Sequence, residues 1–238
     1  MAETGKPPTT LLFFAVPEEA RPFIRRWERI RGATAPRLKG PGLAAWLLEP
    51  DGVVVQVSGM GARNARRVGL ETLARHGGGA GRLLTAGFAG GLDPALRCGT
   101  VLYDADPGLV GMEEWRSAGA QPGRLVEVSR VAVTPADKAR LRMQTGADAV
   151  EMESSTLRSL ARERGIPSAT VRVISDAADE ALPLDFNALL TPEDRIHFGR
   201  LAWAIARSPA SIPRLLAFQR TTAAAAESLA RVLLPGNP

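Results

Sequence analysis

Residues 150–176 read VEMESSTLRSLARERGIPSATVRVISD and contain a helix followed by a buried strand. Met152–Arg164 has the pattern of a helix, and a glycine ends it. Ala169–Ile174 is rich in β-branched residues and predicts a strand that ends on Ser175 and Asp176. Short apolar runs alternate with helical patterns along the rest of the chain in the same way. This alternation predicts a single α/β domain with a mostly buried sheet.

Outward from this stretch, the same patterns predict the remaining elements. The expected strands are Leu11–Val16, Ala44–Leu48, Val53–Val57 and Leu83–Ala86. The expected helices are Pro17–Trp27, Gly61–Arg75, Pro135–Met143 with Thr134 as N-cap, His197–Arg207 and Ile212–Leu234. Asp51-Gly52 predicts a two-residue hairpin turn, and the glycine-rich residues 87–91 predict another turn. Residues 1–10 are expected to be a disordered tail, so that the domain covers 11–238.

Composition excludes several classes of protein. With 238 residues, 45% hydrophobic and 23% charged, the chain has enough apolar material for one sizeable core and is not a disordered protein. Cys98 is the one cysteine, so neither an intramolecular disulfide nor a cysteine zinc cluster can form. With only two histidines, we expect no histidine-rich metal site. We expect no metal and no cofactor. The sequence carries no signal-peptide or membrane-span pattern, which predicts a cytoplasmic protein.

The chain is basic, with a net charge of +5 and a sequence pI near 10.3. Of its 30 cationic residues only Lys6, Lys39 and Lys138 are lysines. The arginines are spread rather than gathered in a stripe, and no basic run is interleaved with aromatic residues. We therefore attribute the charge to composition and expect no nucleic-acid partner.

Polar groups cluster where the expected strands end, which is where open α/β sheets bind their ligands. The four segments are residues 16–21 (VPEEAR), 58–65 (SGMGARNA), 85–92 (TAGFAGGL), and the pair 150–154 (VEMES) with 171–179 (VRVISDAAD). Taken singly, each is as well explained by a helix start, a tight turn or close packing. Their occurrence together and in this order favours a functional site.

These segments resemble the nucleoside phosphorylase/nucleosidase superfamily, and within it the adenosyl nucleosidases typified by methylthioadenosine/S-adenosylhomocysteine nucleosidase. The VEME run, followed about twenty residues later by R-x-I-S-D-x-A-D, is the most specific part. Residues 89–94 (AGGLDP), 145–147 (TGA) and 181–183 (ALP) are similar to the hopanoid-associated phosphorylase-like proteins, which are thought to remove adenine from adenosylhopane. The resemblance implies a three-layer α/β/α sandwich with a mixed, mostly parallel central sheet.

The resemblance also implies roles for individual residues in cleavage of an N-ribosyl bond. Asp176 matches the general acid that protonates the leaving adenine, and Glu19 matches the general base that activates water. A carboxyl must carry a proton to act as the acid, and burial favours this form. The residues implied to bind substrate or flank these two are Glu153 for the ribose hydroxyls, Met152 on the sugar face, Phe88, Ala89 and Gly90 around the ribose, Arg172 and Ser175 beside the acid, and Val131 facing the base. Glu151 and Asp179 are more simply explained as structural residues.

Phe88 departs from the family pattern, which has a small polar residue there, so methylthioadenosine itself is a doubtful substrate. The expected nucleophile is water, because the segment before the glycine run, Leu83–Thr85, lacks the arginine of bacterial phosphorylases. Phosphorolysis and a non-catalytic nucleoside-binding protein are the alternatives.

The resemblance favours a homodimer. At the C-terminal end of the chain, bulky apolar residues alternate with arginines, which suits either a helix pair packed on the core or a weak contact with a membrane surface. The apolar members are Phe198, Leu201, Trp203, Ile205, Ile212, Leu215, Leu216 and Phe218.

Overall fold

The computed structural model describes residues 9–189, 191, 197, 199, 203, 207, 208 and 211–235. Residues 1–8 of the predicted tail lie outside this range, whereas Thr9 and Thr10 already belong to the first strand, so the tail prediction was too long there. The predicted helix at residues 197–207 falls on a segment of which only four residues are described, so most of it lies outside the described residues.

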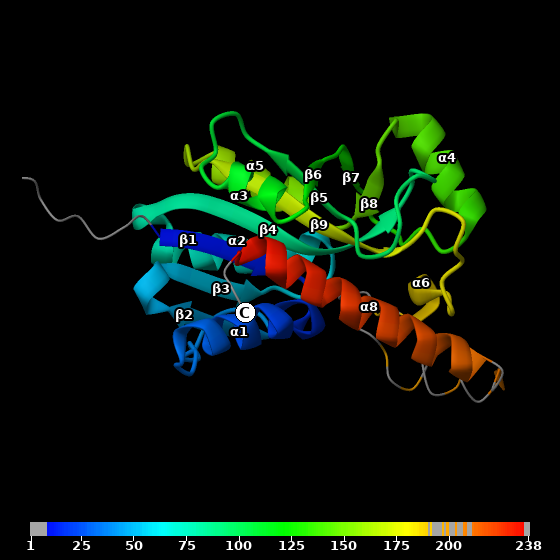
Figure 1. The fold of residues 1–238 in the computed structure, drawn as a ribbon, viewed down its shortest axis with the longest axis horizontal. Coiled ribbons are helices and arrows are strands. Elements are labelled where there is room, and N and C mark those ends of the chain that lie inside the picture. The colour runs from blue at the N-terminus through cyan, green and yellow to red at the C-terminus, as the bar shows by residue number, and fades with distance from the viewer. Residues whose placement is uncertain are drawn as a thin grey trace, which may run out of the picture.

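The elements follow one another in the α/β alternation that the sequence predicts (Figure 1). The strands are β1 (Thr9–Phe14), β2 (Ala44–Leu48), β3 (Val53–Val57), β4 (Ala80–Gly91), β5 (Val101–Ala105), β6 (Gln121–Pro122), β7 (Leu125–Glu127), β8 (Ala149–Glu151) and β9 (Ser168–Asp176). The helices are α1 (Pro17–Arg31), α2 (Gly61–His76), α3 (Met112–Ser117), α4 (Pro135–Thr145), α5 (Ser154–Arg162), α6 (Phe186–Leu189) and α8 (Ile212–Leu233).

One mixed sheet forms the centre of the molecule, in the strand order β2-β3-β1-β4-β9-β5-β6, and β8 pairs with both β4 and β7. The four central strands β3, β1, β4 and β9 run parallel to one another. β2, β5 and β8 are antiparallel to their neighbours in this group. The carboxyl ends of the four parallel strands therefore meet at one edge of the sheet.

The sheet is covered on both faces, and β1 shows why. Successive side chains of a strand point to opposite faces. Leu12 and Phe14 pack in the cluster that includes residues of α1 and α8. Leu11 and Phe13 pack against α2 and α5. The four consecutive apolar residues that end β1 require a layer of helices on each face, so the fold is the expected three-layer α/β/α sandwich with a mostly parallel sheet.

The glycine-rich run was predicted as a turn, and this prediction was wrong. β4 continues through it as far as Gly91 and pairs in parallel with β9 along most of its length. Glycine suits this strand because side chains of other elements, such as Glu19 beside Gly87, occupy the space that a side chain here would fill. The predicted two-residue hairpin turn is also longer: Glu49–Asp51 form a short 3-10 turn, and Gly52 follows in the left-handed conformation with φ of 62°.

At the right-hand side of Figure 1, the sheet edge lies among α4, α6 and the N-terminal half of α8. α8 runs diagonally from this end of the molecule back to a position beside α1. The rings of Phe186 in α6 and Phe218 in α8 lie 6.1 Å apart. Within the described ranges, no helix is both long and apolar enough to cross a membrane.

Candidate active site

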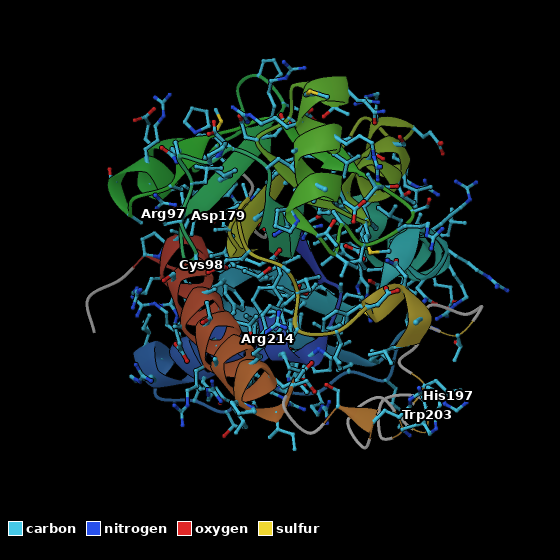
Figure 2. The ribbon with its side chains drawn as sticks, turned by 90° about the vertical axis from the view of Figure 1, so that its right-hand side faces the viewer. Arg97, Cys98, Asp179, His197, Trp203 and Arg214 are labelled. Carbon is cyan, nitrogen blue, oxygen red and sulfur yellow. The ribbon has the colours of Figure 1, made fainter. Side chains whose placement is uncertain are left out.

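A pocket of about 410 Å³ opens at the carboxyl edge of the sheet, on the side of the molecule that faces the viewer in Figure 2. Its floor comes from the ends of β1, β4, β8 and β9 and from the turns that follow them. Of the ten residues that the resemblance implies, nine line the pocket: Glu19, Phe88, Ala89, Gly90, Val131, Met152, Glu153, Ser175 and Asp176. Arg172 is not among the lining residues.

Glu19 lies in the first turn of α1, directly after β1, and its carboxylate is held by three backbone N–H groups. Ala15 and Val16 donate to Oε2 at 2.9 and 3.1 Å, and Phe88 donates to Oε1 at 2.7 Å. The side chain is buried. Burial raises the pKa of Glu19, while Arg172 and these N–H groups lower it, and the net shift is upward.

Behind the pocket, the Arg172 guanidinium lies among three glutamates. Its Nη2 is 2.5 Å from Glu151 Oε2 and 3.6 Å from Glu153 Oε2, and its charge also acts on Glu19. The expectation that Arg172 flanks the acid Asp176 was wrong. It precedes Asp176 by four residues, about 13 Å along a strand, and its guanidinium contacts the glutamates instead.

Glu151 and Glu153 differ although they are two residues apart. Glu151 accepts hydrogen bonds from Glu153 N, Ser154 N, Ser154 Oγ and Arg172, so it fixes the turn into α5. Burial opposes ionisation, but Arg172 and these donors outweigh it and lower the pKa of Glu151. Glu153 accepts one backbone bond, from Gly61 N at 2.7 Å. Burial, with the neighbouring Glu151 charge, raises the pKa of Glu153 to about 8 despite Arg172.

Asp176 lies at the end of β9 and lines the same pocket. Ser175 Oγ donates to its Oδ1 at 2.6 Å, which brings these two predicted residues together. Its Oδ2 lies 2.5 Å from Nζ of Lys138, which comes from α4. Lys138 is the residue that the sequence analysis missed: a lysine in the sequence PADKARLRMQT looks like an exposed helix residue, yet this side chain is 0% exposed.

Two glycines of β4 leave room for the two acids. A Cβ on Gly87 would lie 2.5 Å from Glu19 Oε1 and 2.9 Å from Arg172 Nη1. A Cβ on Gly90 would lie 3.3 Å from Asp176 Oδ2, a close but tolerable contact. The glycine run therefore provides a bare strand surface on which charged side chains rest.

The outer wall of the pocket is apolar. It is formed by Val128, Val131, Leu182, Phe186 and Phe218. The side-chain amide of Asn187 in α6 binds the backbone of Val131 twice, accepting from its N–H and donating to its C=O, both at 2.9 Å. This pair of bonds ties α6 to the segment that was predicted to face the base.

Asp179 is exposed (Figure 2) and is not among the residues that line the pocket. Cys98 is a free thiol whose Sγ lies 3.4 Å from Glu180 Oε2. Burial and the nearby Glu180 raise the pKa of Cys98 to about 11, so it remains a thiol at neutral pH.

Of the apolar residues predicted for a C-terminal surface contact, Phe198, Leu201 and Ile205 lie outside the described residues. Three others are exposed: Trp203 at 62%, Ile212 at 42% and Leu216 at 50%. The Arg207 guanidinium stacks on the Trp203 ring at 4.5 Å.

Residues 119–207 match the family model described as the phosphorylase superfamily. The matched segment contains α4, β8, α5 and β9, and therefore Lys138, Glu153, Arg172 and Asp176. Glu19 and β4 lie outside it. A search of curated proteins gave no significant match.

The fold is similar to solved structures along the whole chain. The chain is 16% identical to futalosine hydrolase of Helicobacter pylori, with a TM-score of 0.68 over 95% of both chains. It is 18% identical to the 5′-methylthioadenosine/S-adenosylhomocysteine nucleosidase of Campylobacter jejuni, with a TM-score of 0.67 over 95% of this chain and 96% of that one. The corresponding enzyme of Neisseria meningitidis, solved with methylthio-immucillin-A, is 20% identical, with a TM-score of 0.63 over 95% and 98%. At this level of identity the similarity establishes the fold.

Proposed function

We propose that this protein is a nucleosidase of the phosphorylase superfamily that hydrolyses the N-ribosyl bond of a 5′-substituted adenosine and releases adenine. The observation that carries the proposal is the meeting of three buried acids, Glu19, Glu153 and Asp176, in one pocket. They come from three separate elements, and each has a different set of partners.

Hydrolysis of such a bond passes through an oxocarbenium-like ribose, which requires a base on the water and an acid on the leaving group. Glu19 is the base. Its three backbone donors orient the carboxylate, and its raised pKa brings it toward the range in which a base can accept a proton at neutral pH. Asp176 is the acid, and it delivers a proton to N7 of the departing adenine.

Glu153 binds the ribose hydroxyls. With a pKa of about 8 it is mostly protonated at pH 7, so its carboxyl can donate one hydrogen bond and accept another. Met152 lines the pocket beside it and covers the face of the sugar. Backbone groups of Phe88, Ala89 and Gly90 complete this side of the ribose site.

Water is the nucleophile in this proposal. Phosphorolysis needs cationic groups to hold phosphate. Among the described residues that line the pocket, none is an arginine or a lysine, and the nucleophile side carries Glu19. A carboxylate there repels a phosphate dianion and suits a water molecule.

The 5′ substituent is a large apolar group, such as the hopane skeleton of adenosylhopane. The support is the wall of Val131, Leu182, Phe186 and Phe218, which would contact a group that extends from the ribose. Phe88, half-buried at the pocket, adds to this apolar surface.

The test is release of adenine from adenosines that carry 5′-methylthio, 5′-hexylthio and hopanyl substituents. We expect the wild type to prefer the longer apolar groups and Asp176→Asn to be inactive with all of them. Asp179→Asn, which changes an exposed residue of the same loop, is the matched control and retains activity. Equal inactivity of the wild type and Asp176→Asn across the panel would mean a non-catalytic protein. Formation of ribose 1-phosphate only when phosphate is present would mean phosphorolysis.

We further propose a homodimer that contacts the membrane surface weakly through the C-terminal segment, where an apolar substrate would be found. The exposed Trp203, Ile212 and Leu216, with the exposed Arg214, support the membrane contact. Flotation with anionic liposomes at low and moderate salt tests it, and absence of lipid binding at both salt concentrations contradicts it. Light scattering measures the oligomer.

A further inference from the structure

Lys138 is the second buried cation at the pocket. Its ammonium makes three contacts, with Asp176 Oδ2 at 2.5 Å, Ala177 O at 2.6 Å and Glu180 O at 2.9 Å. Three acceptors match the three N–H bonds of a charged ammonium. The side chain is 0% exposed, so these contacts replace all of its hydration.

Both oxygens of Asp176 already accept hydrogen bonds, Oδ1 from Ser175 and Oδ2 from Lys138. Every donor therefore points toward the carboxylate, and the resting site is an ammonium–carboxylate pair. An ionised carboxylate has no proton to give to a leaving base.

We propose that Lys138 is a positioning residue that stores the leaving-group proton and passes it to adenine through Asp176. This inference rests on the nucleosidase function proposed above. As the C1′–N9 bond breaks, the Lys138 ammonium gives its proton to the Asp176 carboxylate and Asp176 passes it on to N7, so that Asp176 is ionised again when adenine has left. Lys138 is left as a neutral amine, and Glu19 holds the proton from the attacking water. Solvent at the pocket then returns one proton to Lys138 and takes one from Glu19.

The composition of the chain supports a proton-donating role. Arginine supplies nearly all of the cationic residues, including the buried Arg172 and the half-buried Arg142 and Arg158. At the position facing Asp176 the cation is a lysine. Arginine stays protonated in proteins, whereas a buried lysine can release its proton.

The other ionisable groups near the pair are accounted for. Glu180 Oε2 accepts hydrogen bonds from Ala177 N at 2.9 Å and from Cys98 Sγ, so this carboxylate oxygen interacts with the loop backbone and with the thiol. Cys98 is a neutral thiol at working pH. Arg172 is held by Glu151. The partner of Asp176 is therefore Lys138.

The experiment compares two leaving groups on the same sugar, with 5′-hexylthioadenosine and the corresponding 4-nitrophenyl 5-hexylthio-riboside as probes. Nitrophenolate leaves without a proton, so its release does not need the Lys138–Asp176 pair. For Lys138→Met we expect kcat for adenine release to fall about 10²- to 10⁴-fold, the range of general acid catalysis, with KM and nitrophenol release nearly unchanged. Lys39→Met changes the one exposed lysine among the described residues and is the matched control.

Lys138→Arg separates charge from proton transfer, because arginine keeps the positive charge and gives up no proton. We expect it to lose adenine release as Lys138→Met does while retaining nitrophenol release. Adenine release at the wild-type rate in Lys138→Arg would make Lys138 only a counter-ion and overturn the proposal. Parallel loss of both activities in folded variants would make it a structural residue, with the same consequence. If Lys138→Met does not fold, the adenine and nitrophenol release of Lys138→Arg alone test the proposal. If the wild type turns over neither probe, the nucleosidase function itself fails.

Discussion

Two buried cations lie behind the pocket, and they differ in what surrounds them. Arg172 lies near three glutamates, Glu19, Glu151 and Glu153, whereas Lys138 faces a single carboxylate, Asp176. One positive charge cannot balance three negative ones in a buried site. Burial, together with this excess of negative charge, raises the pKa of Glu153 to about 8 and keeps a proton on it, whereas Lys138 and Asp176 form a pair of one cation and one carboxylate.

The surroundings of the two cations favour opposite directions of proton transfer. The excess of acid around Arg172 favours uptake of a proton, which suits the side where water is deprotonated. The balanced pair at Asp176 holds a lysine that can release one, which suits the side where adenine leaves. The two halves of the pocket would thus be set for opposite directions of proton transfer.

Removing Arg172 should produce the largest effect. Arg172→Met leaves the glutamates without a buried counter-ion, and such losses cost about 3–5 kcal/mol in the free energy of unfolding. Lys138→Met should cost less, because it leaves one buried carboxylate without its cation rather than three. Urea unfolding at pH 7 measures both. Arg67→Met, which removes a surface pair with Glu71, is the control and should cost little. Equal losses for Arg172→Met and Lys138→Met would contradict the comparison.

The two glycines of β4 offer a finer test. Gly87→Ala would bring Cβ within 2.5 Å of Glu19 Oε1, and Gly90→Ala would bring it only to 3.3 Å from Asp176 Oδ2. Displacing the base should lower kcat by about 10²-fold or more in Gly87→Ala, in line with general base catalysis. Gly90→Ala should change kcat much less. The initial rate of adenine release measures the difference, and the reverse order would show that the space beside Glu19 is not critical.

Stability should depend on pH through Glu153. Its folded-state pKa of about 8 lies above the ordinary value of 4.5, so between these values the folded protein holds more protons than the unfolded chain. The free energy of unfolding should therefore fall as pH rises from about 5 to 8, by up to a few kcal/mol. Glu153→Gln should flatten this slope, and Glu18→Gln, an exposed neighbour of the base, should not. Urea unfolding at several pH values distinguishes them; a Glu153→Gln slope equal to that of the wild type contradicts the prediction.

The smallest effect concerns the apolar wall, which neither cation touches. Phe218→Ala should raise KM for 5′-hexylthioadenosine about fivefold to tenfold, since one lost apolar contact is worth about 1 kcal/mol or slightly more. KM for 5′-methylthioadenosine should change little. Leu216→Ala, an exposed position on the same helix, is the control. An equal rise in KM for both substrates would mean that Phe218 does not contact the 5′ group.

Most of the site could be predicted because its residues follow strands in the sequence. Nine of the ten expected residues line the pocket, and most of them lie at or near the carboxyl ends of β1, β4, β8 and β9, where open α/β sheets bind their ligands. Arg172 was misassigned because the sequence cannot say how far along a strand a long side chain reaches.

The sequence by itself determined the alternation of elements, the two-sided burial of β1 and the helix start at Thr134, because these depend on local spacing and capping. Only the tertiary structure decided that the glycine run continues a strand and that Lys138 meets Asp176. The physical reason is the same for both. A glycine and a lysine have no apolar pattern of their own, so their roles depend on neighbours that are distant in the chain, such as Glu19 beside Gly87 and Asp176 beside Lys138.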